Sequence, residues 1–135
     1  MSSEPTRSQP ITASIAPWLS VAYATQAVDY YKTAFDAIEV ERLEDEPGSV
    51  VVAQLSIGGA TFWVQQDADS SPQALGGKLP VRMILTVDDP DSVFAQAIAA
   101  GATEVAPITE GNGWRVGRIE DPSGHHWEIG KPLMS

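Results

Sequence analysis

The sequence predicts an α+β fold made of two similar halves, each with the order strand, helix, strand, strand, strand. The first observation is that this order of elements occurs twice within 135 residues, a length typical of one domain. The second is a nearly constant offset, because Leu19 and Leu85 stand 66 positions apart and Gly59 and Gly124 stand 65 apart. A repeated order at a steady offset indicates an internal duplication.

The first half, which we call module one, is expected over residues 11–66. Its helix is predicted from Thr25, a residue type that caps helix N-termini, to about Ala37. Val28 and Phe35 lie at the spacing of one helix face. Segments of alternating or apolar character bounded by turn residues predict its strands, at 11–22, 38–43, 49–57 and 60–66.

The second half, module two, is expected over residues 80–132, after a polar linker at 67–79. Asp89 and Pro90 form a typical helix start, and Gly101 is a typical residue just after a helix end. Its strands are predicted at 81–87, near Val105, at 113–120 and at 125–129. Residues 1–10 are polar and contain two prolines, so we expect a disordered tail before one domain spanning 11–132.

The composition excludes several function classes. Eighteen acidic residues against eight basic ones give a formal net charge of −10, which disfavours nucleic acid and anionic membranes as partners. The chain contains no cysteine, so disulfides, thiolate metal sites and cysteine nucleophiles are excluded. No apolar run approaches the ~20 residues of a membrane span. We therefore expect a cytoplasmic protein whose partner is a small molecule.

Alternation along the predicted strands separates two faces of the sheet. One face is apolar, with residues such as Leu19, Val64, Leu85 and Ile129, and should pack under the helices. The other face mixes aromatic, polar and charged side chains: Trp18, Ser20, Trp63, Gln65, Arg82, Ile84, His126 and Glu128. A curved sheet with such a face predicts a ligand cavity rather than a dry core.

Three segments carry a resemblance to a known family: residues 17–21 (Pro-Trp-Leu-Ser-Val), residues 27–35, and the turn Asp121-Pro122-Ser123-Gly124-His125 before the last strand. Over residues 11–132 the chain resembles the vicinal oxygen chelate superfamily, most closely its PhnB-like branch. The superfamily includes glyoxalase I, bleomycin-resistance proteins, fosfomycin-resistance transferases and extradiol dioxygenases. The resemblance implies two βαβββ modules forming a curved, barrel-like mixed sheet around a central cavity, and a homodimer.

The resemblance also implies where metal-using members hold their ion. The four ligand positions fall on Ala16, Trp63, Arg82 and Glu128 in this sequence. Only Glu128 is of a ligand type, and Arg82 carries a permanent positive charge. A catalytic divalent metal usually has about three protein ligands. We therefore predict that the metal site is lost and that no cofactor is used.

The candidate ligand-binding residues are aromatic or cationic. A tryptophan offers a flat face to rings or cations, and an arginine can meet a carboxylate, a phosphate or a carbonyl group. Simpler interpretations stay open: the tryptophans as core packing, the arginines as surface charge, and Arg82 with Glu128 as a structural ion pair. The candidates are Trp18, Trp63, Arg82, Trp114, Arg115 and Arg118.

The leading functional hypothesis is a metal-independent protein of the bleomycin-resistance type that sequesters an aromatic or cationic compound. The first alternative is a lyase- or isomerase-like enzyme in which Glu128 or His126 acts as acid or base on a carbonyl substrate. These two residues are two apart on one strand and share a face. A further alternative is a metal-dependent glyoxalase- or dioxygenase-like enzyme with relocated ligands, for example with Gln65 as a third ligand. Whether the protein is an enzyme is left open.

Overall fold

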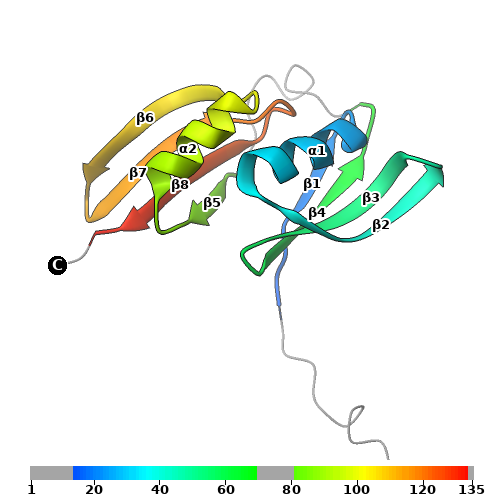
Figure 1. Ribbon diagram of the computed structural model, residues 1–135, viewed down its shortest axis with the longest axis horizontal. Helices are drawn as coiled ribbons and strands as arrows, with labels where there is room; N and C mark the ends of the chain where they lie inside the picture. Colours follow the sequence, from blue (N-terminus) through cyan, green and yellow to red (C-terminus); the bar gives the residue numbers. More distant parts are fainter. Residues whose placement is uncertain (1–13, 70–80, 134–135) are drawn as a thin grey trace, which may run out of the picture.

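A computed structural model describes residues 14–69 and 81–133 as two helices lying over two four-stranded sheets (Figure 1). The expected tail at 1–10, and the expected linker beyond Asp69, lie outside the described residues. The elements confirm the predicted α+β class. In chain order they are β1 (Trp18–Val21), α1 (Ala24–Phe35), β2 (Ile38–Glu46), β3 (Ser49–Ile57), β4 (Ala60–Gln66), β5 (Met83–Thr86), α2 (Pro90–Ala99), β6 (Thr103–Gly111), β7 (Trp114–Glu120) and β8 (His126–Pro132).

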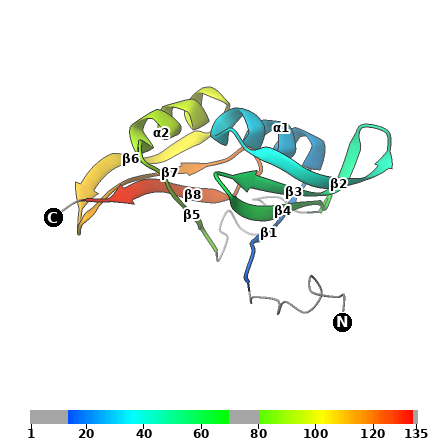
Figure 2. The same ribbon diagram turned by 60° about the horizontal axis from the view of Figure 1, so that its bottom comes forward.

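The two sheets have the same topology, as an internal duplication requires. The strand order is β1-β4-β3-β2 in the first sheet and β5-β8-β7-β6 in the second. In each sheet the short first strand pairs in parallel with the last strand of its module, and the other pairs are antiparallel. The sheets are not closed into a barrel, so the expected enclosed cavity is instead a sheet surface on the side away from the helices (Figure 2). We call this surface the open face.

The start of α1 differs from the sequence prediction. The helix begins at Ala24, and Thr25 lies inside its first turn rather than at the N-cap. The side chain of Gln66, at the end of β4, accepts a hydrogen bond from the Ala24 backbone N–H across 2.7 Å. The Thr25 hydroxyl instead accepts from the backbone N–H of Val50 across 3.1 Å. Thr25 therefore links the helix to β3, and a distant strand residue supplies the cap.

The core lies between the helices and the sheets, on the face that the alternation predicted. Leu19, Val64, Leu85 and Ile129 are all at most 9% exposed. The core also holds the inner face of α1, where seven of its twelve residues are buried: Ala24, Ala27, Val28, Tyr30, Tyr31, Ala34 and Phe35. Burying these apolar side chains stabilises the layered arrangement of helices on sheets.

A buried carboxylate joins the two modules. Asp121 is 3% exposed, and its Oδ2 accepts hydrogen bonds from the Tyr31 hydroxyl at 2.6 Å and the Trp127 indole N–H at 2.8 Å. Its Oδ1 accepts from the backbone N–H groups of Ser123 at 2.9 Å and His125 at 3.0 Å. Tyr31 belongs to α1 of module one, while the other three donors flank Asp121 in module two. Four donors thus satisfy a carboxylate that would otherwise be costly to bury.

Aromatic packing surrounds this carboxylate. The ring of Trp127 lies 4.7 Å from that of Phe35 and 5.6 Å from that of Phe62, measured between ring centroids. The His125 Nε2 lies 2.9 Å from the Ser20 carbonyl oxygen, a distance that suits an Nε2–H donor. These contacts cross between the modules, so α1, β1 and β4 of the first module hold the turn that leads into β8.

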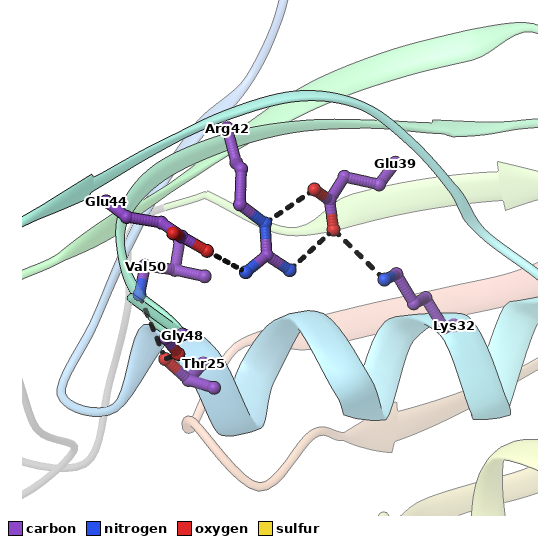
Figure 3. Close-up of polar contacts among 7 residues, drawn as sticks. All are labelled: Thr25, Lys32, Glu39, Arg42, Glu44, Gly48 and Val50. Carbon is purple, nitrogen blue, oxygen red and sulfur yellow. Dashed lines mark hydrogen bonds and ion pairs between the residues drawn. The ribbon is translucent and has the colours of Figure 1, made fainter. Parts of the chain in front are cut away.

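An ionic network holds α1 against β2 at the edge of the first sheet (Figure 3). The Glu39 carboxylate contacts Arg42 at 2.6 and 2.7 Å and the Lys32 ammonium at 3.0 Å. Arg42 also donates to Glu44 across 2.7 Å. The hydrogen bonds from Arg42 are the main cause that lowers the pKa of Glu39 to about 2, and Lys32 adds to the effect.

We predict that Asp121→Asn strongly destabilises the protein. The amide would turn an N–H group toward the buried Trp127 donor and lose the charged acceptor, which costs roughly 1–3 kcal/mol or more. Tyr31→Phe removes one donor and leaves the carboxylate in place, so it should cost less. Urea unfolding followed by tryptophan fluorescence measures both. An Asp121→Asn variant within error of the wild type would contradict the assigned role of the carboxylate.

We predict that the stabilisation supplied by Glu39 disappears in acid. Its folded-state pKa is about 2, below the ordinary value of 4.5, so its contribution is present above pH 4.5 and is lost as the pH falls toward 2. The free energy of unfolding of the wild type should therefore exceed that of Glu39→Gln by roughly 0.2–1 kcal/mol at neutral pH, the range measured for accessible ion pairs. Urea unfolding at several pH values measures the difference. Glu41→Gln is the matched control and should show no such loss, because a register shift after Glu39 pairs Glu41 with Gln54 and turns it to the opposite face of β2.

Candidate functional site

Register across the second sheet brings charged and apolar side chains together on the open face. Glu128 of β8 is paired with Ile84 of β5 on one side and with Arg118 of β7 on the other. Paired residues in neighbouring strands project from the same face of a sheet. Arg82, just before β5, reaches the same carboxylate. Three predicted site residues thus meet in one cluster.

The cluster consists of one carboxylate between two guanidinium groups. Arg82 Nε lies 2.7 Å from Glu128 Oε2, and Arg118 Nη2 lies 2.8 Å from the same oxygen. The side chains of Arg82 and Arg118 are 50% and 33% exposed, and that of Glu128 is 21% exposed. The ion pair between Arg82 and Glu128, one of the interpretations that the sequence left open, is therefore present. Arg118 adds a second cation to it. We call these three residues the Arg–Glu–Arg cluster.

Beside this cluster the open face is hollowed. A hollow of about 290 Å³ lies between β5, β7 and β8, and it is lined by Ile84, Gly111, Asn112, Trp114, Val116, Glu128 and Gly130. A second hollow, of about 410 Å³, lies toward β6 and includes Arg118 and Glu128 in its lining. Glu128 therefore separates two hollows, and Trp114 offers an aromatic surface at the first, where its side chain is 38% exposed.

Gly130 is a part of this site that sequence reasoning missed. A Cβ atom at this position would lie 2.5 Å from the Arg115 carbonyl oxygen and 2.8 Å from the Cβ of Val116. The missing side chain therefore permits the close approach of β7 and β8 beside the hollow. Gly130 directly follows the predicted strand 125–129, which the structure extends to Pro132, and a glycine at such a position is the signal that could have shown it.

On the first sheet, two tryptophans stack on the open face. Trp18 of β1 is in register with Trp63 of β4, and their ring centroids are 5.9 Å apart with 26° between the planes. The Trp18 indole N–H donates to the Gln65 side-chain oxygen across 2.9 Å. Trp18 is 52% exposed, so core packing does not explain its position. The pair is a second aromatic surface on the open face.

Two further residues singled out from the sequence, Arg115 and His126, do not belong to the Arg–Glu–Arg cluster. Arg115 pairs with Asp91 of α2 at 2.6 Å and with Glu110 at 3.2 Å, because it alternates with Trp114 and points to the helix side of the sheet. The structure thus does not bring Arg115 to the hollow. His126 lies on the open face one row from Glu128, with its Nε2 3.8 Å from Glu120 Oε1.

The side chains at the expected metal positions do not fit a divalent ion. Ala16 and Trp63 offer no ligand atom, Arg82 is a cation, and the Oε2 of Glu128 is in ion-pair contact with two guanidinium groups. Within residues 14–69 and 81–133, no three His, Asp or Glu side chains are grouped so that they could hold a metal. The chemistry of this donor set favours contacts with a ligand's rings and oxygen atoms.

Comparison with known proteins identifies the family. Residues 18–130 match the model of the glyoxalase-like domain, and the chain belongs to this family. The fold is that of the glyoxalase/bleomycin-resistance proteins, so the chain is a member of the vicinal oxygen chelate superfamily, as the sequence motifs indicated.

The relatives show how far the likeness extends. An uncharacterised protein of Mycobacterium tuberculosis is 38% identical over 132 residues, which cover 91% of this chain and 76% of the relative. TioX from Micromonospora sp. ML1 has a TM-score of 0.72 at 24% identity, covering 90% of this chain and all of TioX. A glyoxalase/bleomycin resistance protein/dioxygenase family enzyme from Burkholderia phytofirmans PsJN has a TM-score of 0.68 at 19% identity, over 86% of this chain and 95% of that one. These structural likenesses establish the fold.

Neither α1 nor α2, the helices in the described part of the chain, is long and apolar enough to cross a membrane.

Proposed function

We propose that this protein binds a small aromatic molecule on its open face without the help of a metal ion. The observation that carries the proposal is the hollow in which Ile84, Trp114 and Val116 form an apolar wall next to Glu128. The Arg–Glu–Arg cluster lies where the superfamily resemblance would place a metal ligand. An apolar wall with a few convergent polar groups is the usual composition of a small-molecule site.

The aromatic character of the ligand follows from the exposed indole rings. Trp18 and Trp114 are 52% and 38% exposed on the open face, which is unusual for the largest apolar side chain. A ligand that removes ~100 Å² of apolar surface from water gains roughly 2.5 kcal/mol. Offset or edge-to-face contact between rings adds about 0.5–1.5 kcal/mol. A flat ring therefore gains more here than a flexible polar compound.

Of the two ligand classes expected from the sequence, the site supports the aromatic one better than the cationic one. The overall charge of −10 would attract a cation from a distance. At the hollow, however, the Glu128 carboxylate is already matched by Arg82 and Arg118. A cationic group that approached Glu128 would meet the like charges of these two arginines.

The same cluster argues for binding rather than acid–base chemistry at Glu128. A general base must present a lone pair to the substrate proton within about 2.6–3.2 Å. Glu128 Oε2 instead accepts a hydrogen bond from Arg118 and forms an ion pair with Arg82. We therefore assign Glu128 to partial neutralisation of the two guanidinium charges. His126, beside Glu120, lies outside the residues that line the two hollows.

We predict that the purified protein binds a naphthalene-type probe saturably, and with the same affinity before and after treatment with a chelator. Trp114→Ala should weaken binding by about tenfold, because one aromatic wall is worth about 1 kcal/mol or more. Tyr23→Ala is the matched control, since Tyr23 is 68% exposed and does not line the hollow. Calorimetric titration measures the affinities, and mass spectrometry measures bound metal. Binding that needs a stoichiometric metal, or turnover of the probe, would contradict the proposal.

We also propose that the protein is a homodimer, as the family resemblance implies. Edge strand β2 leaves three apolar residues exposed, Ile38 68%, Val40 54% and Leu43 62%, and burial of these side chains against a second chain would favour association. Light scattering should give about twice the chain mass of 14.4 kDa. A single-chain mass at all concentrations from micromolar to millimolar would contradict this expectation.

A further inference from the structure

We infer that the ligand carries a carboxylate beside its aromatic part and that Arg82 and Arg118 bind this carboxylate. The inference rests on the proposed function and specifies the chemical class of the ligand. It follows from the ratio of cations to anions in the Arg–Glu–Arg cluster, where two guanidinium groups share a single carboxylate oxygen.

In this cluster two arginines contact one carboxylate, whereas each of the other described arginines contacts two carboxylates. Arg42 contacts two carboxylates, those of Glu39 and Glu44. Arg115 also contacts two, those of Asp91 and Glu110. Such pairing is what an acidic chain with a net charge of −10 should produce. Two arginines that share one acid are therefore an exception. The acid they share, Glu128, lines both hollows, and Arg118 lines the second.

Most donors of the two guanidinium groups have no carboxylate partner within the described part of the chain. A guanidinium has five N–H donors, and in residues 14–69 and 81–133 the one carboxylate in contact with Arg82 or Arg118 is Glu128. Arg82 approaches it through Nε and Arg118 through Nη2, so each keeps a further pair of N–H groups. Side-chain exposures of 50% and 33% leave these groups within reach of a ligand.

The geometry of these donors fits a carboxylate best. Two parallel N–H groups of a guanidinium match the two oxygens of a carboxylate, and the charge strengthens both hydrogen bonds. A neutral amide offers one acceptor and turns its own N–H donors toward the arginines. An ammonium group would add a third positive charge. The expected order of affinity is thus carboxylate, then amide, then ammonium.

The acidic character of the whole chain does not prevent this contact. Charges farther away than about 8–10 Å are largely screened at ordinary ionic strength. The nearest further carboxylate in register on this face is that of Glu120, which lies 3.8 Å from the His126 ring. Direct contact with two arginines therefore decides the preference, and added salt should weaken it.

Calorimetric titration with 2-naphthoate, 2-naphthamide and 2-naphthylmethylammonium tests the inference, because the three probes share one ring system and differ in charge. We expect naphthoate to bind about tenfold more tightly than the amide, in line with the gain from a charge-assisted hydrogen bond. The ammonium probe should bind most weakly. In Arg118→Gln the advantage of naphthoate should be lost. Arg42→Gln, outside the open face, is the control and should leave the advantage unchanged.

The variant Glu128→Gln gives a second test, in which naphthoate binding is expected to become stronger rather than weaker. Removal of the competing charge leaves the side-chain shape unchanged and frees both guanidinium groups, so naphthoate should bind several-fold more tightly than to the wild type. Loss of naphthoate binding in a Glu128→Gln variant that unfolds in urea like the wild type would overturn the inference.

The outcomes separate the two proposals. Equal affinities for naphthoate and naphthamide would overturn the carboxylate inference and leave the proposed aromatic site intact. A naphthoate preference that persists in the Arg82→Gln/Arg118→Gln double variant would overturn the assignment to these two residues. No heat of binding with any of the three probes, in protein that melts cooperatively, would overturn the proposed function and the inference with it.

Discussion

The buried carboxylate of Asp121 is the constraint on which the arrangement of the site depends. It closes the turn before β8 through two backbone N–H groups and connects that turn to Tyr31 of the first module and Trp127 of the second. Gly124 completes the turn with a φ of 96°, a conformation that side chains disfavour. These hydrogen bonds fix the first residues of β8. A shift in the register of the strand would take hydrogen-bond donors away from the buried Asp121 carboxylate, which is costly.

The register of β8 also decides which of its side chains lie in the core and which lie on the open face. Successive residues of a strand point to opposite faces, so the anchoring of Trp127 in the core directs Glu128 outward. The same pairing sets Arg118 and Ile84 on either side of Glu128. A one-residue slip would turn the carboxylate into the core and the indole into the hollow. The stability of the fold and the composition of the site are thus set by the same hydrogen bonds.

The duplication gives the two modules one geometry and different side chains. Trp18 and Trp63 stand in the first sheet where Ile84 and Glu128 stand in the second. The first sheet therefore presents stacked aromatic rings, and the second presents a hollow next to paired charges. This difference matches a ligand with a ring and an acidic group, and it shows how one repeated scaffold can supply two kinds of contact. The proposed function rests on these substituted positions and not on the fold.

The features that are local or periodic could be predicted from the amino-acid sequence alone. These are the order of elements in each module, the division into core and open faces, the turn at Asp121, and the poor donor set at the expected metal positions. Which side chains become partners could not be predicted in this way, because it depends on the tertiary structure. It joined Arg118 to Glu128, directed Arg115 to Asp91, and placed Gln66 at the start of α1. These choices depend on the register between strands far apart in the chain, and β6 shifts its register twice along β7, which no local pattern encodes.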